Sequence, residues 1–98
     1  MTQETLYTDA VGLLKQLIAT PSFSSEEDAT AEILFRFLQQ KDVTPYRFKN
    51  NIWALNKHFN KSLPSILLNS HHDTVKPNVQ YTRNPFDAAI EDGKLYGL

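Results

Sequence analysis

The sequence predicts an α/β fold in the order two helices, hairpin, buried strand, hairpin. Apolar residues recur at helical spacing in the N-terminal part of the chain, which is typical of amphipathic helices. Asn50-Asn51 and Asp92-Gly93 each separate two short strand-like runs, as hairpin turns do. The run from Ser65 to Leu68 is continuously apolar and follows a proline, which favours a short buried strand. Because amphipathic helices need a sheet face to cover, these elements belong together.

The first helix is predicted over Thr5–Ala19, and it ends at Thr20-Pro21 because the residue before a proline avoids helical dihedrals. A second helix is predicted from about Glu26 to Gln40. Ser24 and Glu27 have the spacing of a capping box at its start. One apolar stripe along this helix is expected to face a core, and its members are Ala29, Thr30, Ile33, Leu34, Phe37 and Leu38.

Strand-like runs over residues 43 to 48 and 52 to 55 predict a hairpin from roughly Pro45 to Asn56, with Pro45 confining the first strand to an edge position. His58 follows in a polar connection, where a lone histidine is expected to be solvated. Residues 75 to 86 predict a loop that packs back on the sheet. A second hairpin is predicted over residues 88 to 96, turning at Asp92-Gly93.

Composition excludes several functional classes. The chain is 98 residues long, 41% hydrophobic and 21% charged, as expected of one small domain or part of a larger one. A net charge of −1 gives no reason to expect a nucleic-acid or membrane partner. There is no cysteine, no signal-peptide pattern and no apolar run long enough to span a bilayer. We therefore expect a cytoplasmic location.

The chemistry concentrates in the segment Asn69-Ser70-His71-His72-Asp73, at the end of the predicted buried strand. In an extended chain, alternate residues share a face, so His71 and Asp73 are expected on one side and His72 on the other. Open α/β sheets place ligands at the carboxyl ends of their strands. Three interpretations stay open from the residues alone: a metal site, acid–base or nucleophilic chemistry without metal, or a structural turn. No glycine-flanked serine is present to complete a triad.

The surrounding segments resemble the start of the dinuclear zinc aminoacylase/peptidase family, which includes acetylornithine deacetylase, succinyl-diaminopimelate desuccinylase, carboxypeptidase G and dipeptidases. The first motif of that family is an apolar strand followed by Ser/Gly-His-x-Asp-x-Val, matched here by residues 67 to 75. Further agreement comes from the segments at residues 50 to 54, 84 to 86 and 92 to 98. The resemblance covers nearly the whole chain, and within the family it is strongest to the acetylornithine deacetylase branch.

By position, the resemblance implies that His71 binds one of two zinc ions and that Asp73 orients His71 and supports catalysis. Cobalt or manganese are possible alternatives to zinc. His72 falls at the variable position of the motif and is expected to be a surface or supporting residue. Tyr81 and Asn84 depart from the residues common in the family, at positions that look like packing.

The resemblance further implies a fold and a reaction. Residues 1–98 would be the N-terminal portion of a mixed-sheet, zinc-exopeptidase-like catalytic domain, with the rest of that domain and a smaller dimerising domain absent. The intact protein would be a homodimer that hydrolyses a small N-acyl amino acid with metal-activated water, while a glutamate outside this chain acts as general base. Because a catalytic zinc needs about three protein ligands, the chain alone is predicted to be inactive. The alternative is a small non-catalytic binding domain in which His-His-Asp is structural.

Overall fold

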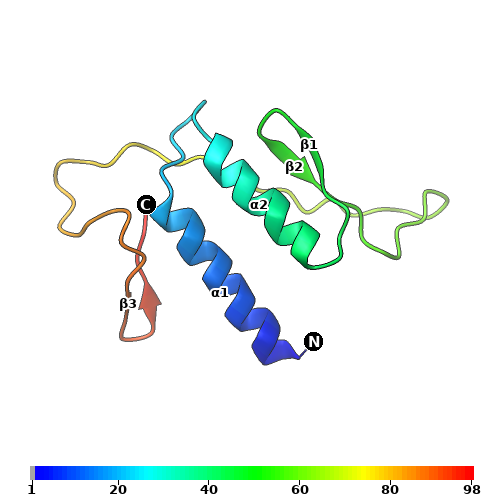
Figure 1. Cartoon of the computed structure of the whole chain (residues 1–98), viewed down its shortest axis with the longest axis horizontal. Coiled ribbons are helices and arrows are strands. Elements are labelled where there is room, and N and C mark those ends of the chain that lie inside the picture. The colour runs from blue at the N-terminus through cyan, green and yellow to red at the C-terminus, as the bar shows by residue number, and fades with distance from the viewer. Residues whose placement is uncertain (1) are drawn as a thin grey trace.

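A computed structural model describes residues 2–98 and contains two helices and two small antiparallel sheets (Figure 1). The elements are α1 (Gln3–Ala19), α2 (Asp28–Gln40), β1 (Tyr46–Phe48), β2 (Asn51–Trp53), β3 (Ile90–Glu91) and β4 (Lys94–Leu95). The small α/β character and the order of helices and hairpins agree with the sequence-based prediction.

Helix α1 begins two residues earlier than predicted because Thr2 caps it. The Thr2 hydroxyl accepts a hydrogen bond from the Thr5 amide at 3.1 Å, which satisfies one of the free N–H groups of the first turn. The helix ends at Ala19, and Thr20 takes an extended conformation ahead of Pro21, as predicted.

The predicted capping box at the start of α2 is wrong. Ser25 adopts a left-handed φ of 70°, and the Glu26 amide donates to the Phe23 carbonyl at 2.7 Å, so the chain first makes a tight turn. Glu27 takes the N-cap position without a side-chain cap. Its carboxylate instead accepts from the Ser25 amide at 2.7 Å. The helix consequently begins at Asp28, two residues later than predicted.

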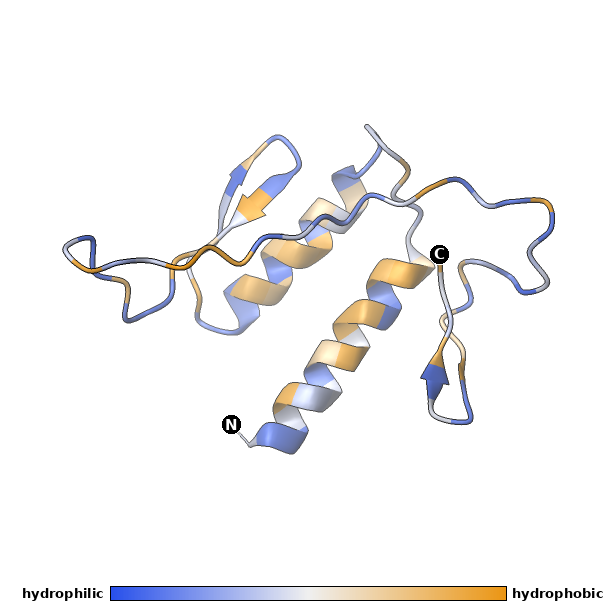
Figure 2. Ribbon diagram, turned by 180° about the vertical axis from the view of Figure 1, so that it is seen from behind, coloured by the Kyte–Doolittle hydropathy of each residue, from blue (hydrophilic) through white to orange (hydrophobic). Residues whose placement is uncertain are grey.

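The two helices lie side by side and run in opposite directions (Figures 1 and 2), and α2 also packs against β2. An ion pair between Lys41 and Asp9 joins the end of α2 to α1. Of the predicted α2 stripe, Thr30 is fully buried, as is the neighbouring Ala31. Helix α2 therefore forms the centre of the packed region.

The first hairpin is confirmed, but its turn lies one residue earlier than predicted. Strand β1 pairs with β2 in the register Tyr46 to Trp53 and Phe48 to Asn51, which leaves Lys49 and Asn50 in the turn. Lys49 takes the left-handed conformation with φ 56°. The rings of Tyr46 and Trp53 stack across the strands with centroids 5.8 Å apart, which fixes the register.

The segment predicted as a buried strand is neither a strand nor buried. Ile66, Leu67 and Leu68 are 89%, 84% and 91% exposed. Within residues 2–98, the only β-bridge near this segment joins Thr74 to Phe23 in parallel. A strand is defined by its ladder to a neighbour, and no described residue supplies one here. The apolar sequence pattern therefore produces an extended, solvent-facing segment in this structure.

The second hairpin is confirmed with shorter strands than predicted. Asp92 and Gly93 form its turn, and both have positive φ, 52° and 75°, as a type I′ turn requires. The predicted loop before it contains no regular secondary structure. Phe86 in this loop contacts Phe23 at 6.2 Å between ring centroids, so the loop packs on the α1–α2 connection.

The described residues do not enclose a full hydrophobic core. Ala31 is the single buried apolar residue among residues 2–98. The radius of gyration is 15.5 Å, against about 13 Å for a compact domain of this length. Figure 2 shows hydrophobic residues along both helices and in the segment that follows β2. In the part of the chain that the structure describes, neither helix is long and apolar enough to span a membrane.

Candidate metal centre

The His71-His72-Asp73 segment is held in place at its end by the α1–α2 connection. The Thr74 amide donates to the Ser22 carbonyl at 2.8 Å, within the isolated parallel bridge between Phe23 and Thr74. Ser22 is 1% exposed. The segment is thus attached to a buried part of the molecule although the residues before it are open to solvent.

His71 and Asp73 lie on the same face of the segment and contact each other, as the alternation of an extended chain predicts. His71 Nδ1 is 2.8 Å from Asp73 Oδ1 and 3.1 Å from the Asp73 carbonyl oxygen. An ionised carboxylate and a carbonyl only accept hydrogen bonds, so Nδ1 must be the donor. In the neutral ring this leaves the lone pair on Nε2 free to bind a metal ion.

The His71–Asp73 pair is open to its surroundings. The His71 side chain is 82% exposed and that of Asp73 is 39% exposed. Both side chains line a shallow cleft together with Phe23, Ser24, Thr74, Val75, Lys76 and Leu98. A ligand or a further segment of protein could therefore reach His71 Nε2 without displacing any buried group.

The donor set fits part of a metal site. A histidine whose Nδ1 donates to a carboxylate is the usual arrangement of a metal-binding imidazole. Within residues 2–98, however, no group of three or more His, Cys, Asp or Glu side chains is placed to hold an ion. A catalytic zinc takes about three protein ligands. The chain thus contributes one ligand and its orienting carboxylate, and the roles assigned to His71 and Asp73 stay predictions.

His72 points away from this pair, as predicted, and makes contacts that sequence reasoning missed. Its Nδ1 is 2.7 Å from Thr30 Oγ1 in α2, and its Nε2 is 3.0 Å from the Asn50 carbonyl oxygen in the β1–β2 turn. Its own carbonyl accepts from the Ser22 hydroxyl at 2.8 Å. The sequence feature that could have indicated these contacts is Thr30, whose hydroxyl lies in an otherwise apolar helical stripe and needs a hydrogen-bond partner.

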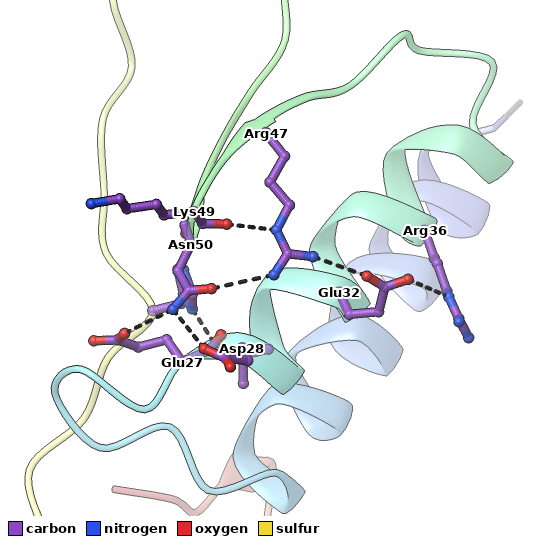
Figure 3. A network of polar contacts seen from close by, with 9 residues as sticks. Glu27, Asp28, Glu32, Arg36, Arg47, Lys49 and Asn50 are labelled. Atoms are coloured by element: carbon purple, nitrogen blue, oxygen red, sulfur yellow. Dashed lines mark hydrogen bonds and ion pairs between the residues drawn. The ribbon is translucent and has the colours of Figure 1, made fainter.

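A polar network fixes the β1–β2 turn on α2 (Figure 3). Asn50 Nδ2 donates to Asp28 Oδ1 at 2.8 Å, and Arg47 donates to Asn50 Oδ1 at 3.2 Å. Arg47 also donates to Glu32 at 2.9 Å and to the Lys49 carbonyl at 2.6 Å. The carbonyl of Asn50 that meets His72 therefore belongs to a turn with several anchors.

The third histidine, His58, lies exposed in the connection after β2, as predicted. It lines a different cleft, together with Asn56, Phe59 and Leu63, and neither His71 nor Asp73 lines that cleft.

An imidazole held by a carboxylate, with its other nitrogen open, is an arrangement that metal-binding histidines commonly have. No protein-family model matches the chain. The chain is similar to the succinyl-diaminopimelate desuccinylases of Caulobacter sp. (strain K31), 30% identical over 96% of this chain, and of Delftia acidovorans, 33% identical over 87%. It is also similar to a protein named "Probable carboxypeptidase" from Emericella nidulans, 35% identical over 82%.

Each of these matches covers only part of the relative, 25% of both desuccinylases and 21% of the carboxypeptidase. The chain thus spans about a quarter of the length of the curated relatives it matches. These similarities support the resemblance to the zinc aminoacylase/peptidase family, in which desuccinylases and carboxypeptidases both occur. They leave the acetylornithine deacetylase branch without specific support.

Proposed function

We propose that the chain is the N-terminal part of the catalytic domain of a metal-dependent amidohydrolase, which removes an acyl group from an N-acyl amino acid. The observation that carries the proposal is the contact between His71 and Asp73 at 2.8 Å with His71 Nε2 left open. The similarity to desuccinylases and carboxypeptidases over most of this chain supports the same reaction class, because both kinds of enzyme hydrolyse an amide bond.

In this proposal His71 holds one metal ion through Nε2, and Asp73 holds His71. The Asp73 carboxylate accepts from Nδ1, which fixes the tautomer, orients the ring and raises the basicity of Nε2. Zinc, or cobalt or manganese in its place, supplies a water of lowered pKa and polarises the scissile carbonyl when bound. The remaining ligands, the bridging aspartate and the general-base glutamate are proposed to lie outside this chain.

The open architecture is consistent with a chain that completes its core with further protein. Ile66, Leu67 and Leu68 are almost fully exposed although their pattern is that of a buried strand. Such a segment needs a neighbouring strand on at least one side to form a ladder. We propose that the full protein is a cytoplasmic homodimer, and that its substrate is a small acylated amino acid of the acetylornithine type.

The test is hydrolysis by the full-length protein that carries this chain, loaded with Zn²⁺ or Co²⁺. N-acetylornithine, N-succinyl-diaminopimelate and a carboxypeptidase peptide form the substrate panel. Faster turnover of N-acetylornithine than of the other two substrates supports the proposed substrate of the acetylornithine type. Preference for the succinylated substrate would support the amidohydrolase reaction but would show that the acyl group is succinyl and not acetyl. A metal-free, inactive protein of this sequence supports the alternative of a non-catalytic binding domain.

The variant that tests the site is His71→Ala. It should remove one metal ion per active site and nearly all activity, because the metal loses a ligand that no other described residue can replace. The metal-free forms of the variant and the wild type should differ in stability by less than about 0.5 kcal/mol, since the side chain is mostly exposed. His58→Ala is the matched control, an exposed histidine away from the site. Normal metal content and turnover in the His71 variant would refute the assignment.

A further inference from the structure

His72 is linked to more separate elements than any other residue of the motif. Its two ring nitrogens meet Thr30 in α2 and the Asn50 carbonyl in the β1–β2 turn, and its backbone carbonyl meets Ser22 in the α1–α2 connection. These three partners lie 42, 22 and 50 residues away in the sequence. One side chain and one carbonyl thus join the metal motif to the rest of the packed region.

The partners of this imidazole select one tautomer of its neutral form. The Asn50 carbonyl only accepts, so His72 Nε2 carries the proton. In the neutral ring Nδ1 is then an acceptor, and it receives the hydroxyl proton of Thr30 at 2.7 Å. Each partner therefore meets the complementary ring nitrogen, whereas the other neutral tautomer would place a lone pair of Nε2 against the Asn50 carbonyl oxygen.

Both partners are themselves held in place. Thr30 is 0% exposed and sits on the most buried face of α2. Asn50 is anchored by Asp28 and Arg47, and Figure 3 shows both bonded to its side-chain amide. The imidazole therefore bridges two fixed points, and its position determines where the backbone of residues 71 to 73 can lie.

The loss of this imidazole would leave little buried polarity unpaired. The Thr30 hydroxyl is also 3.1 Å from the Glu27 carbonyl and can donate there instead. Asn50 is only half-buried, so water can reach its carbonyl. The main consequence of removing the side chain is consequently a change in the position of the motif rather than an unsatisfied group.

We propose that His72 is a positioning residue for the metal site. By contacting α2 and the β1–β2 turn at once, it fixes the backbone between His71 and Asp73 and so aligns the ligand with its orienting carboxylate. This inference rests on the proposed function of His71, and it adds a role for the variable position of the motif.

The experiment compares variants that remove one anchor each, in the full-length protein loaded with Co²⁺. His72→Asn can still accept from Thr30, and His72→Gln can still donate to Asn50, while His72→Ala does neither. Thr30→Val removes the partner hydroxyl at nearly constant volume, and Thr30→Ser keeps it. The readouts are kcat, KM, Co²⁺ affinity and the visible absorption of bound Co²⁺, which reports the geometry of the ligands.

We expect His72→Ala to lower kcat roughly tenfold, the lower end of the range for residues that support a metal ligand. KM should change little, the Co²⁺ absorption should shift, and the Asn and Gln variants should fall between Ala and the wild type. Thr30→Val should lower kcat in the wild type, have little further effect in His72→Ala, and be rescued by Thr30→Ser, since the two residues share one contact.

Two failures are distinguishable. A wild-type protein that binds no Co²⁺ and hydrolyses none of the substrates overturns the proposed function and this inference with it. A wild-type protein that is active, with His72→Ala and Thr30→Val both retaining its kcat and Co²⁺ absorption, overturns this inference alone. If His72→Ala does not fold, the Asn, Gln and Thr30 variants decide the question by the same readouts.

Discussion

The two faces of the segment His71–Asp73 differ in how completely the rest of the chain engages them. On one face, His72 meets Thr30 and Asn50 through both ring nitrogens. On the other face, within residues 2–98, His71 bonds only to Asp73, two residues further along, and its side chain is 82% exposed. Alternation along an extended chain thus separates an anchored histidine from an available one, although the two are adjacent in sequence.

The residue type alone therefore does not mark a ligand. Both histidines have an Nε2 and an Nδ1, and both lie at the same end of the same segment. Nε2 of His72 is occupied by a carbonyl oxygen, whereas in the part of the chain that the structure describes no group occupies Nε2 of His71. Only the second arrangement leaves a lone pair that a metal ion can use.

Of the remaining variants, Asp73→Asn should have the largest effect. It acts on the open face of the segment, which is the face that carries His71 and Asp73. The amide is a weaker acceptor than the carboxylate for His71 Nδ1, so the ring is less firmly oriented and Nε2 is less basic. We expect turnover by the full-length enzyme to fall about 10- to 100-fold, with the fold retained. Steady-state kinetics and metal content measure it.

Asp42→Asn is the matched control for this prediction. Asp42 is exposed and has a left-handed φ of 57°, a conformation that asparagine tolerates. The same change of charge there should leave turnover as in the wild type. An unchanged rate in Asp73→Asn would remove Asp73 from the mechanism and would leave the open face without its orienting group.

Ser22→Ala should have a smaller effect, confined to the anchored face. It removes the hydroxyl that donates to the His72 carbonyl and should cost about 1 kcal/mol of local stability. The Thr74 amide, which donates to the Ser22 carbonyl, reports the opening of this face. Its hydrogen exchange should accelerate by roughly fivefold, the factor that corresponds to about 1 kcal/mol.

Ser24→Ala controls for this prediction, because Ser24 is exposed in the same connection and no described residue bonds to its hydroxyl. Exchange at Thr74 should be the same in that variant as in the wild type. Equal exchange in the Ser22 and Ser24 variants would mean that the hydroxyl of Ser22 does not hold the segment.

The sequence predicted the elements whose determinants are local. The end of α1 at Thr20-Pro21 and the Asp92-Gly93 turn both follow from dihedral preferences of a few adjacent residues, and both are confirmed. The first hairpin was predicted with its turn one residue late, because Lys49 adopts the left-handed conformation that asparagine was expected to take.

The features that sequence reasoning missed depend on partners distant in the chain. The burial of Ile66 to Leu68 requires a strand alongside, and the described residues include none that pairs with this segment. The contacts of His72 join residues 22, 30 and 50, which no local pattern connects. Alternation predicted the side to which His72 points, but it could not identify what lies there.

The smallest effect is expected at the β3–β4 hairpin, whose ion pair includes no residue of the motif. Its main polar feature is the ion pair of Arg83 and Glu91 at 2.7 Å, with Arg83 also lying over the Tyr96 ring at 3.7 Å. The hydrogen bond from Arg83 lowers the pKa of Glu91 below its usual value, and the charge of the guanidinium adds to this effect. Because the pKa is lower in the folded state, the pair stabilises the hairpin above the ordinary pKa of glutamate. That contribution disappears as the pH falls through the folded-state value. Both side chains are largely in solvent, so the effect on stability is small.

An NMR titration of the Glu91 carboxyl carbon should give a midpoint below 4.5, and Arg83→Gln should return it toward that value. A midpoint that Arg83→Gln leaves unchanged would show that the pair does not persist in solution.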